Sequence, residues 1–245
     1  MLSHRAVLAS AICAVAIFGG GCQPAEDSAL AKVGGREPIS TASLAVAPAP
    51  LPTITKGADF GGLELTAGVR YVADRVVNSD DAHGLPFLIV DKTDARVVAF
   101  DAGGRVIGIS PVLLGLARGD DSVPGIGERR IADIRPEERT TPAGRFEAEL
   151  GENTHGDDIL WVDYDNAVSM HRLRAVKASE RRLHRLASAT AADNRISYGC
   201  INVPAAFYDS VVKRLFAPRN GIVYVLPETR PIETLFSQTS RTVSR

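Results

Sequence analysis

The sequence predicts a mainly β domain with a few helices at its edge, an α+β fold. Short runs rich in β-branched and aromatic residues, separated by turn residues, recur from residue 86 onward. Few segments show the spacing of an amphipathic helix. The 245 residues are 45% hydrophobic, enough for one sizeable core or two small ones. With 28 basic and 29 acidic side chains, the charge balance predicts no nucleic-acid partner.

Residues 1–22 have the pattern of an export signal. Arg5 precedes an apolar run of about thirteen residues, which is too short for a membrane-spanning helix. The following "GGGC" resembles a bacterial lipobox, although Gly19 stands where an aliphatic residue is usual. Lipidation of Cys22 and its removal with the signal both stay open. We expect an exported protein of the periplasm or cell envelope, whose only membrane contact is this signal peptide or a lipid anchor at Cys22.

The rest of the chain divides by composition. Residues 23–58 are rich in Ala, Pro, Ser and Gly, which predicts a flexible tether. A helical lead-in is expected over residues 59–85, because apolar residues recur there at helical spacing. The main domain is expected over residues 86–228, and a tail with little pattern over residues 229–245.

Short segments rich in β-branched and aromatic residues, separated by turn residues, predict the strands of the main domain. The candidates are "PFLIVDK", "ARVVAFD", "GRVIGISPVLLG", "RIADI", "GRFEAEL", "DILWVDY", "NAVSMH" and "GIVYVLPE". The first three, with turn residues between them, predict a β-meander. Pro204 opens a helix candidate, and the basic stretch over residues 172–196 also has helical spacing.

The cysteine count singles out one residue. Cys13 lies in the signal and Cys22 is removed or lipidated, so the folded part carries only Cys200, in "RISYGCINV". Exported proteins normally pair their thiols, so an unpaired cysteine indicates a reactive group.

A thiol is nucleophilic as a thiolate, which requires an imidazole or another positive group nearby. His171 directly follows a strand-like run, where a rigid element would hold it. His83 and His155 lie in polar loops, and His184 lies in the basic stretch, so solvent exposure is expected for these three. His171 is therefore the candidate base for Cys200.

The neighbours of Cys200 add to this interpretation. Gly199 lets the backbone approach a ligand, and the amides around Gly199 and Cys200 could point at an oxyanion. In an extended chain Cys200 and Asn202 share one face, while Ile201 points to the core. A small buried hydrophobe is the other common fate of a free cysteine, and the residues alone leave both interpretations open.

The motif "ISYGCINV" resembles the signature of the L,D-transpeptidase catalytic domain, the YkuD family. That signature begins with Ser or Thr, followed by a position that is usually His. Gly, Cys, an aliphatic residue and then Asn or Arg complete it. An upstream His that ends a strand precedes the whole motif. The matching positions are Ser197, Gly199, Cys200, Ile201 and Asn202, with His171 as the upstream base. "TTPAGRF", residues 140–146, resembles the family's TP-x-G-x-F segment, and the first strands resemble its opening hairpins. The resemblance covers about residues 86–227.

The sequence departs from the family at three places. Tyr198 stands where His is usual, and "HRL" replaces the usual His-Gly pair at His171. The segment between His171 and Cys200 is longer than is typical and forms a basic insertion over residues 172–196. This insertion is either a solvated helix face or a lid whose guanidinium groups, with Arg172 and Arg174 as candidates, hold substrate carboxylates.

The resemblance implies a peptidoglycan L,D-transpeptidase that works without a cofactor or metal. Cys200 would form a thioester with a tetrapeptide stem, His171 would act as base and acid, and D-Ala would leave before an amine acceptor takes the acyl group. The candidate substrate-binding residues are Ser197, Tyr198 and Asn202 of the motif and, from the basic insertion, Arg172 and Arg174. An L,D-carboxypeptidase that uses water and a catalytically lapsed wall-binding module stay open as alternatives. The implied partners are peptidoglycan stem peptides.

Overall fold

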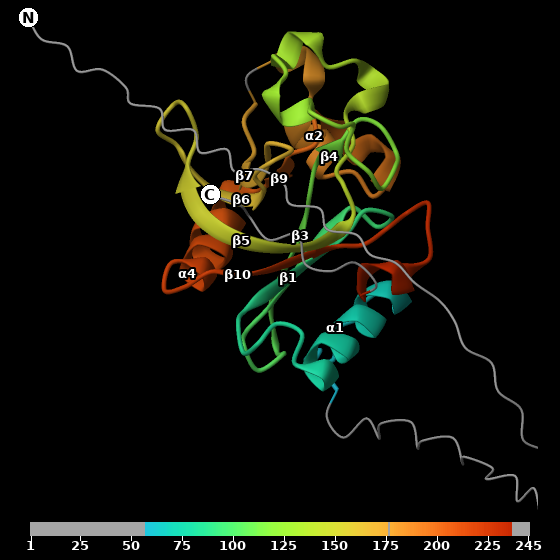
Figure 1. Ribbon diagram of the computed structural model, residues 1–245, viewed down its shortest axis with the longest axis vertical. Coiled ribbons are helices and arrows are strands. Elements are labelled where there is room, and N and C mark those ends of the chain that lie inside the picture. The colour runs from blue at the N-terminus through green and yellow to red at the C-terminus, as the bar shows by residue number, and fades with distance from the viewer. Residues whose placement is uncertain (1–56, 176, 237–245) are drawn as a thin grey trace, which may run out of the picture. The chain divides into compact units, whose positions relative to one another are not determined.

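The computed structural model describes residues 57–175 and 177–236 (Figure 1). The expected export signal and all but the end of the expected tether lie outside the described residues, and so do Cys13 and Cys22. In the described part, no helix is both long and apolar enough to span a membrane.

The described residues are mainly β, which confirms the predicted fold class. Their strands are β1 Phe87–Asp91, β2 Arg96–Phe100, β3 Val106–Pro111, β4 Leu114–Gly115, β5 Gly144–Glu152, β6 Asp158–Asp163, β7 Val168–Arg172, β8 Arg195–Ser197, β9 Ile201–Val203 and β10 Gly221–Val225. Eight of these strands form one sheet in the order β3, β2, β1, β10, β5, β6, β7, β9, and β4 pairs with β8. The expected meander is present, because β1, β2 and β3 are antiparallel neighbours.

The long strand β5 joins the two halves of the sheet. Residues 144–148 pair with β10, whereas residues 149–152 pair with β6. Figure 1 shows β5 curving between these partners. Alternate residues from both halves face one core, as the two layers of a sandwich do. Members of this core include Leu88, Val97, Phe146, Leu160, Met170, Ile201 and Val223.

Helix α1, Ala67–Ser79, lies within the expected lead-in and covers a second apolar cluster. Its buried residues recur at helical spacing, and the Thr66 hydroxyl caps it by accepting from the amide of Val69 at 3.3 Å. A 3₁₀ turn, Ile232–Phe236, follows the last strand, and its Leu235 is buried in the same cluster. This part of the tail therefore has structure where the sequence showed little pattern.

The helix after the cysteine motif packs on the first core. It runs from α3, Ala205–Phe207, through a π-helical segment, Tyr208–Val212, into α4, Lys213–Phe216. Its buried residues are Phe207, Tyr208, Val212 and Phe216. This packing anchors the chain on the C-terminal side of Cys200.

The prediction of a strand at "RIADI" was wrong. Residues Ile131–Asp133 form one of three successive 3₁₀ turns, the others being Ile126–Glu128 and Pro136–Glu138. Local polar contacts hold this loop: the Glu138 carboxylate accepts hydrogen bonds from Arg129 and from both the amide and the guanidinium of Arg135. Ile131 is 64% exposed, so no core contact holds these residues in an extended form.

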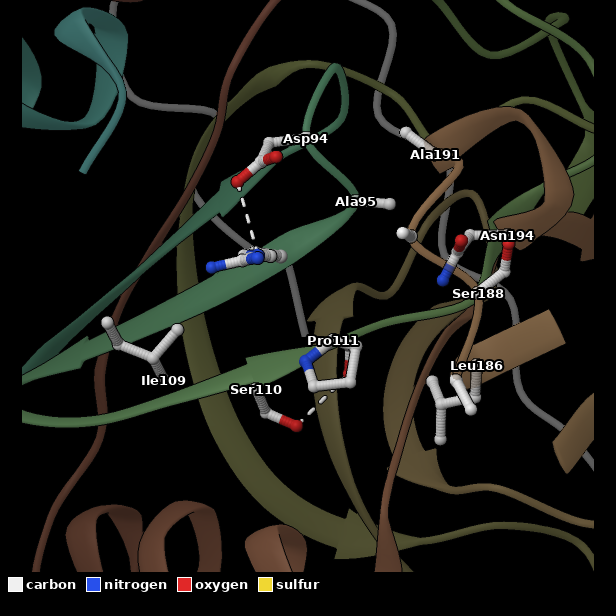
Figure 2. Close-up of a pocket in the computed structure, with 12 residues that line it drawn as sticks. Asp94, Ala95, Ile109, Ser110, Pro111, Leu186, Ser188, Ala191 and Asn194 are labelled. Atoms are coloured by element: carbon white, nitrogen blue, oxygen red, sulfur yellow. Dashed lines mark hydrogen bonds and ion pairs between the residues drawn. The ribbon is translucent and has the colours of Figure 1, made fainter. Parts of the chain in front are cut away.

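The basic insertion has less helix than its spacing predicts. Helix α2 spans only Arg182–Leu186, and 3₁₀ turns cover Ala178–Glu180 and Ala191–Asn194. The insertion meets the meander around a cavity of about 410 Å³, where Leu186 and Asn194 face residues of β3 (Figure 2). Buried Asn194 donates a hydrogen bond to the carbonyl of Val112 at 2.9 Å, which fixes the end of the insertion.

Candidate active site

Parallel pairing of β7 with β9 brings the predicted base and nucleophile together. Met170 lies opposite Ile201, and His171 lies opposite Asn202. Met170 and Ile201 are fully buried in the first core. Because side chains alternate along a strand, His171 and the residues flanking Ile201 face away from that core.

The Cys200 thiol lies at the start of β9, against the end of the turn before β7. The Ser169 hydroxyl donates to its Sγ at 3.6 Å, and the Ala167 carbonyl lies 3.6 Å from the same atom. Cys200 is a free, partly exposed cysteine. The thiol is therefore open to the cavity and held by polar contacts, unlike a buried hydrophobe.

The His171 ring is fixed through one nitrogen. Its Nδ1 lies 2.8 Å from the carbonyl oxygen of Arg172. A carbonyl only accepts, so Nδ1 carries the proton of the neutral ring, and Nε2 is left as the basic nitrogen. This is the tautomer that a proton acceptor for a neighbouring thiol needs.

The two groups shift each other's protonation. Burial alone acts to raise the pKa of the Cys200 thiol, but the hydrogen bond and charge of His171, with hydrogen bonds from Ser169, outweigh it and lower the pKa below its usual value. For His171, burial acts to lower the pKa, but the hydrogen bond and charge of Cys200 outweigh burial and raise it. Both shifts favour a thiolate beside an imidazolium.

The loop before the thiol is shaped around Gly199. Its φ of +132° is open only to glycine, and a Cβ there would lie 2.9 Å from the carbonyl oxygen of Thr140. The Gly199 carbonyl accepts from the Thr141 hydroxyl at 2.8 Å, and its amide donates to Ser197 Oγ at 3.1 Å. Ser197 in turn donates to the Cys200 carbonyl at 2.6 Å. The Gly199 amide is thus engaged within the loop.

A cavity of about 340 Å³ opens at the thiol. Its lining residues are Ile131, His171, Arg174, Lys177, Glu180, Arg182, Ser197, Tyr198, Cys200 and Asn202. Tyr198 is 36% exposed, and the Arg139 guanidinium stacks on its ring at 4.0 Å from the centroid. Tyr198 therefore forms part of the wall, tied to the 3₁₀ loop.

The structure separates the two arginines expected to bind substrate. Arg174 lines the cavity and pairs with Asp157. The Arg172 guanidinium pairs with Asp158 at 2.7 Å and with Asp209, and it stacks on Tyr208. Hydrogen bonds from Arg172 hold the pKa of Asp158 at about 2. Arg172 thus joins β7 to β6 and the following helix and is not among the cavity residues.

The other expected site residues lie as follows. Asn202 lines the cavity and donates to the Cys200 carbonyl at 3.2 Å. His83, His155 and His184 are absent from the cavity wall. Within residues 57–175 and 177–236, no group of three or more His, Cys, Asp or Glu residues is placed to hold a metal ion.

Three residues near the thiol were not identified from the sequence: Ser169, Thr141 and Arg182. Ser169 had a usable signal, since it lies two residues before His171 on a strand and so shares its face. Thr141 lies in a quoted family segment, but its bond to Gly199 joins residues 58 positions apart. Arg182 was one of several equivalent-looking cations, and only the fold distinguishes it.

No family model and no curated relative matches the chain. The similar solved structures include several L,D-transpeptidase catalytic domains. The L,D-transpeptidase of Xylanimonas cellulosilytica is 16% identical with a TM-score of 0.38, over 58% of this chain and 60% of that chain. The helical cell shape determining protein Pgp2 of Campylobacter jejuni is 16% identical with a TM-score of 0.39, over 60% of this chain and 49% of that chain.

A third similar structure is the L,D-transpeptidase LdtMt1 in complex with imipenem, 16% identical with a TM-score of 0.32, over 58% of each chain. The chain thus covers less than two thirds of the length of each of these three proteins. With TM-scores below 0.5, the likenesses establish no chemistry for this chain.

Proposed function

We propose that this protein is a cysteine-dependent acyltransferase of the L,D-transpeptidase type that acts on peptidoglycan tetrapeptide stems outside the cytoplasm. The observation that carries the proposal is the pairing of Cys200 with His171 at an open cavity, with both pKa values shifted toward the ion pair. The substrate class rests on the resemblance of "ISYGCINV" and "TTPAGRF" to the family segments.

In the proposed first half-reaction, the His171 Nε2 takes the thiol proton, and the thiolate attacks the carbonyl carbon before the terminal D-residue. The carbonyl oxygen becomes an oxyanion in the tetrahedral intermediate. His171 then protonates the leaving nitrogen, the C–N bond breaks, and D-Ala departs from a thioester on Cys200. The Nδ1 contact with the Arg172 carbonyl supports this role, because it keeps the ring oriented in both protonation states.

We assign the oxyanion role to the amide of Cys200, because the Gly199 amide is engaged within the loop. The Gly199 amide donates to Ser197, so it is unavailable to substrate. Its carbonyl is likewise engaged, by Thr141. Gly199 therefore shapes the loop, and the amide next to it supplies the donor.

The second half-reaction distinguishes transfer from hydrolysis. A side-chain amine of a neighbouring stem that attacks the thioester gives a cross-link and restores the thiol. Water in the same position gives an L,D-carboxypeptidase. Both routes use His171 as the base that accepts a proton from the attacking group.

Product analysis with peptidoglycan fragments tests the proposal. The mature chain is incubated with a tetrapeptide stem, alone and with an amine acceptor stem, and the products are separated and weighed by mass spectrometry. We expect D-Ala release, with a cross-linked dimer for a transpeptidase or a tripeptide for a carboxypeptidase. The Cys200→Ala protein is the matched control and releases no D-Ala.

Imipenem gives an independent readout of the thiol, since a similar structure was solved in complex with it. We expect an adduct on Cys200, detected by intact mass. Absence of both the adduct and D-Ala release, in a folded wild-type protein across a range of pH, contradicts the enzyme and leaves the wall-binding module that Tyr198 in place of His suggests.

A further inference from the structure

One wall of the Cys200 cavity is cationic. Arg174, Lys177 and Arg182 line it, with Glu180 as the acidic lining residue on the same insertion. Glu180 pairs with Arg182, and Asp157 outside the lining pairs with Arg174, so these three cations and two anions leave an excess of one positive charge. A cavity with such a wall favours an anionic ligand group over a neutral one.

Two hydrogen bonds fix the Arg182 side chain in this wall. Its side chain is 15% exposed. The Nε group donates to the Glu180 carboxylate at 2.5 Å, and Nη1 donates to Asn202 Oδ1 at 2.9 Å. Among residues 57–175 and 177–236, Nη2 has no hydrogen-bond partner, so its two N–H donors are unused. A guanidinium fixed through two nitrogens has lost its freedom before a ligand arrives, which favours binding.

The same contacts place this guanidinium relative to the nucleophile. Asn202 accepts from Arg182 through Oδ1 and donates from Nδ2 to the carbonyl of Cys200 at 3.2 Å. Asn202 also lies opposite His171 in the parallel pair of strands. The buried Asn202 amide therefore links Arg182 to the main chain of Cys200, from the strand position opposite His171.

We infer that Arg182 forms a carboxylate subsite of the Cys200 cavity, in which Nη2 donates to a free carboxylate of the bound stem peptide. Arg174 and Lys177 add positive charge around it. This inference rests on the proposed function and names the group by which that site recognises its substrate. It assigns to Arg182 the role that the sequence suggested for Arg172, whose guanidinium is occupied by Asp158 and Asp209.

Two carboxylates of a stem peptide have the required chemistry. One is the C-terminal carboxylate of the leaving D-residue, and the other is a side-chain carboxylate on the part that stays as the acyl group. Analogues with one or the other group amidated distinguish them, because an amide removes the charge and keeps the shape.

The test measures binding to full-length protein carrying Cys200→Ala, so that no turnover intervenes. Dissociation constants for a synthetic tetrapeptide stem and its two amidated analogues are measured by calorimetry, with and without Arg182→Gln. We expect Arg182→Gln to weaken binding of the parent peptide by about ten- to a hundredfold. For the analogue in which the bound carboxylate is amidated, Arg182→Gln should leave the dissociation constant unchanged.

Arg181→Gln is the matched control, because Arg181 is the exposed neighbour outside the cavity wall. We expect this substitution to change the dissociation constant less than twofold. Arg182→Lys, which keeps the charge without the planar fork, should restore part of the affinity. Thermal melting of each variant shows whether the insertion still folds.

The subsite is overturned if folded Arg182→Gln and Arg181→Gln proteins bind the parent peptide equally, or if no stem peptide binds. It is also overturned if both amidated analogues lose as much affinity with Arg182→Gln as the parent does. D-Ala release by the wild-type chain is measured separately. Arg182-dependent binding without such release contradicts the proposed function and leaves the subsite standing.

Discussion

At the residue scale, the protonation state of the Cys200 thiol depends on two polar side chains beside its sulfur, those of His171 and Ser169. Burial raises the pKa of a thiol and would make Cys200 inert. The imidazole of His171 and the hydroxyl of Ser169 reverse that effect. The resemblance to a family signature indicated Cys200 and His171, while Tyr198 in place of the usual His is tied to Arg139 and takes no part in these contacts.

The pH dependence of alkylation tests this pairing. The lowered pKa of Cys200 places the rise of iodoacetamide reactivity below pH 9.0, the ordinary pKa of the thiol, and the raised pKa of His171 keeps the imidazolium beside the thiolate to higher pH. In His171→Asn only burial and the Ser169 contacts remain, so the rise moves to higher pH. Ser169→Ala should move it the same way by less.

If the alkylation rate rises at the same pH in the wild-type and His171→Asn proteins, His171 does not control the protonation of the Cys200 thiol. The alkylation rate is followed by intact mass between pH 5 and 10, a range within which both proteins must remain folded by circular dichroism. The control is His155→Asn, since His155 lies in an exposed loop outside the cavity.

At the element scale, the "TTPAGRF" segment supports the cysteine loop. Buried Thr141 accepts from the amide of Gly115 at 2.8 Å and donates to the carbonyl of Gly199 at 2.8 Å. It thereby connects β4 to the turn that presents Cys200. Two hydrogen bonds thus give this segment a structural role at the cysteine loop.

Replacing Thr141 with Val removes both bonds at nearly constant shape. Two buried backbone groups then lose their partner, and we expect the free energy of unfolding to fall by about 1–3 kcal/mol. Urea denaturation followed by fluorescence measures the change. The exposed Thr190→Val is the control and should change stability by less than about 0.5 kcal/mol. If Thr141→Val lowers the free energy of unfolding no more than Thr190→Val does, Thr141 does not support the cysteine loop.

Some of the strands and side-chain contacts could be predicted from the sequence, and others could not. Short runs of β-branched and aromatic residues predicted the central strands β1, β2 and β10, because nearly every residue of these strands is buried. At "RIADI" the apolar residues were misleading, since Ile131 is exposed and only Ile134 is buried. The sequence could not show which arginine is free to bind a ligand, because the contacts of each lie on other elements. Arg172 pairs with Asp209, and Arg182 donates to Asn202.

At the scale of the whole described domain, a buried charge network joins its two ends. Lys92, at the end of β1, is fully buried and donates to Asp120 at 2.8 Å. Asp120 also accepts from the amides of Glu228 and Thr229, and Arg195 pairs with Glu228 at 2.7 Å. The network therefore ties the meander, the strand before the cysteine motif and the C-terminal segment together.

Asp120→Asn should strongly destabilise the domain, by about 3–5 kcal/mol, because it removes the carboxylate at 2.8 Å from buried Lys92 and leaves only the longer pair with Glu228 at 3.7 Å. Burial acts to raise the pKa of Asp120, but hydrogen bonds from Lys92, Thr229 and the main chain lower it below its usual value. The stability from this group is therefore complete above pH ~3.9 and is lost as pH falls toward the folded-state pKa.

Urea denaturation at several pH values measures both effects. The difference between wild-type and Asp120→Asn proteins should be largest near neutral pH and shrink in acid. Asp121→Asn, a change at the exposed adjacent carboxylate that pairs with Arg230, is the control and should cost less than about 1 kcal/mol. Equal losses in the two variants would show that the network does not hold the domain together.

Attack by the Cys200 thiolate is tested by the mass of the protein when the reaction is stopped during turnover. The wild-type chain is mixed with a tetrapeptide stem without acceptor, quenched in acid within seconds, and weighed intact and after proteolysis. We expect a thioester on the Cys200 peptide with the mass of the stem minus D-Ala, absent from Cys200→Ala and reduced in His171→Asn. D-Ala release without any adduct on Cys200, or an adduct on another residue, would contradict this expectation.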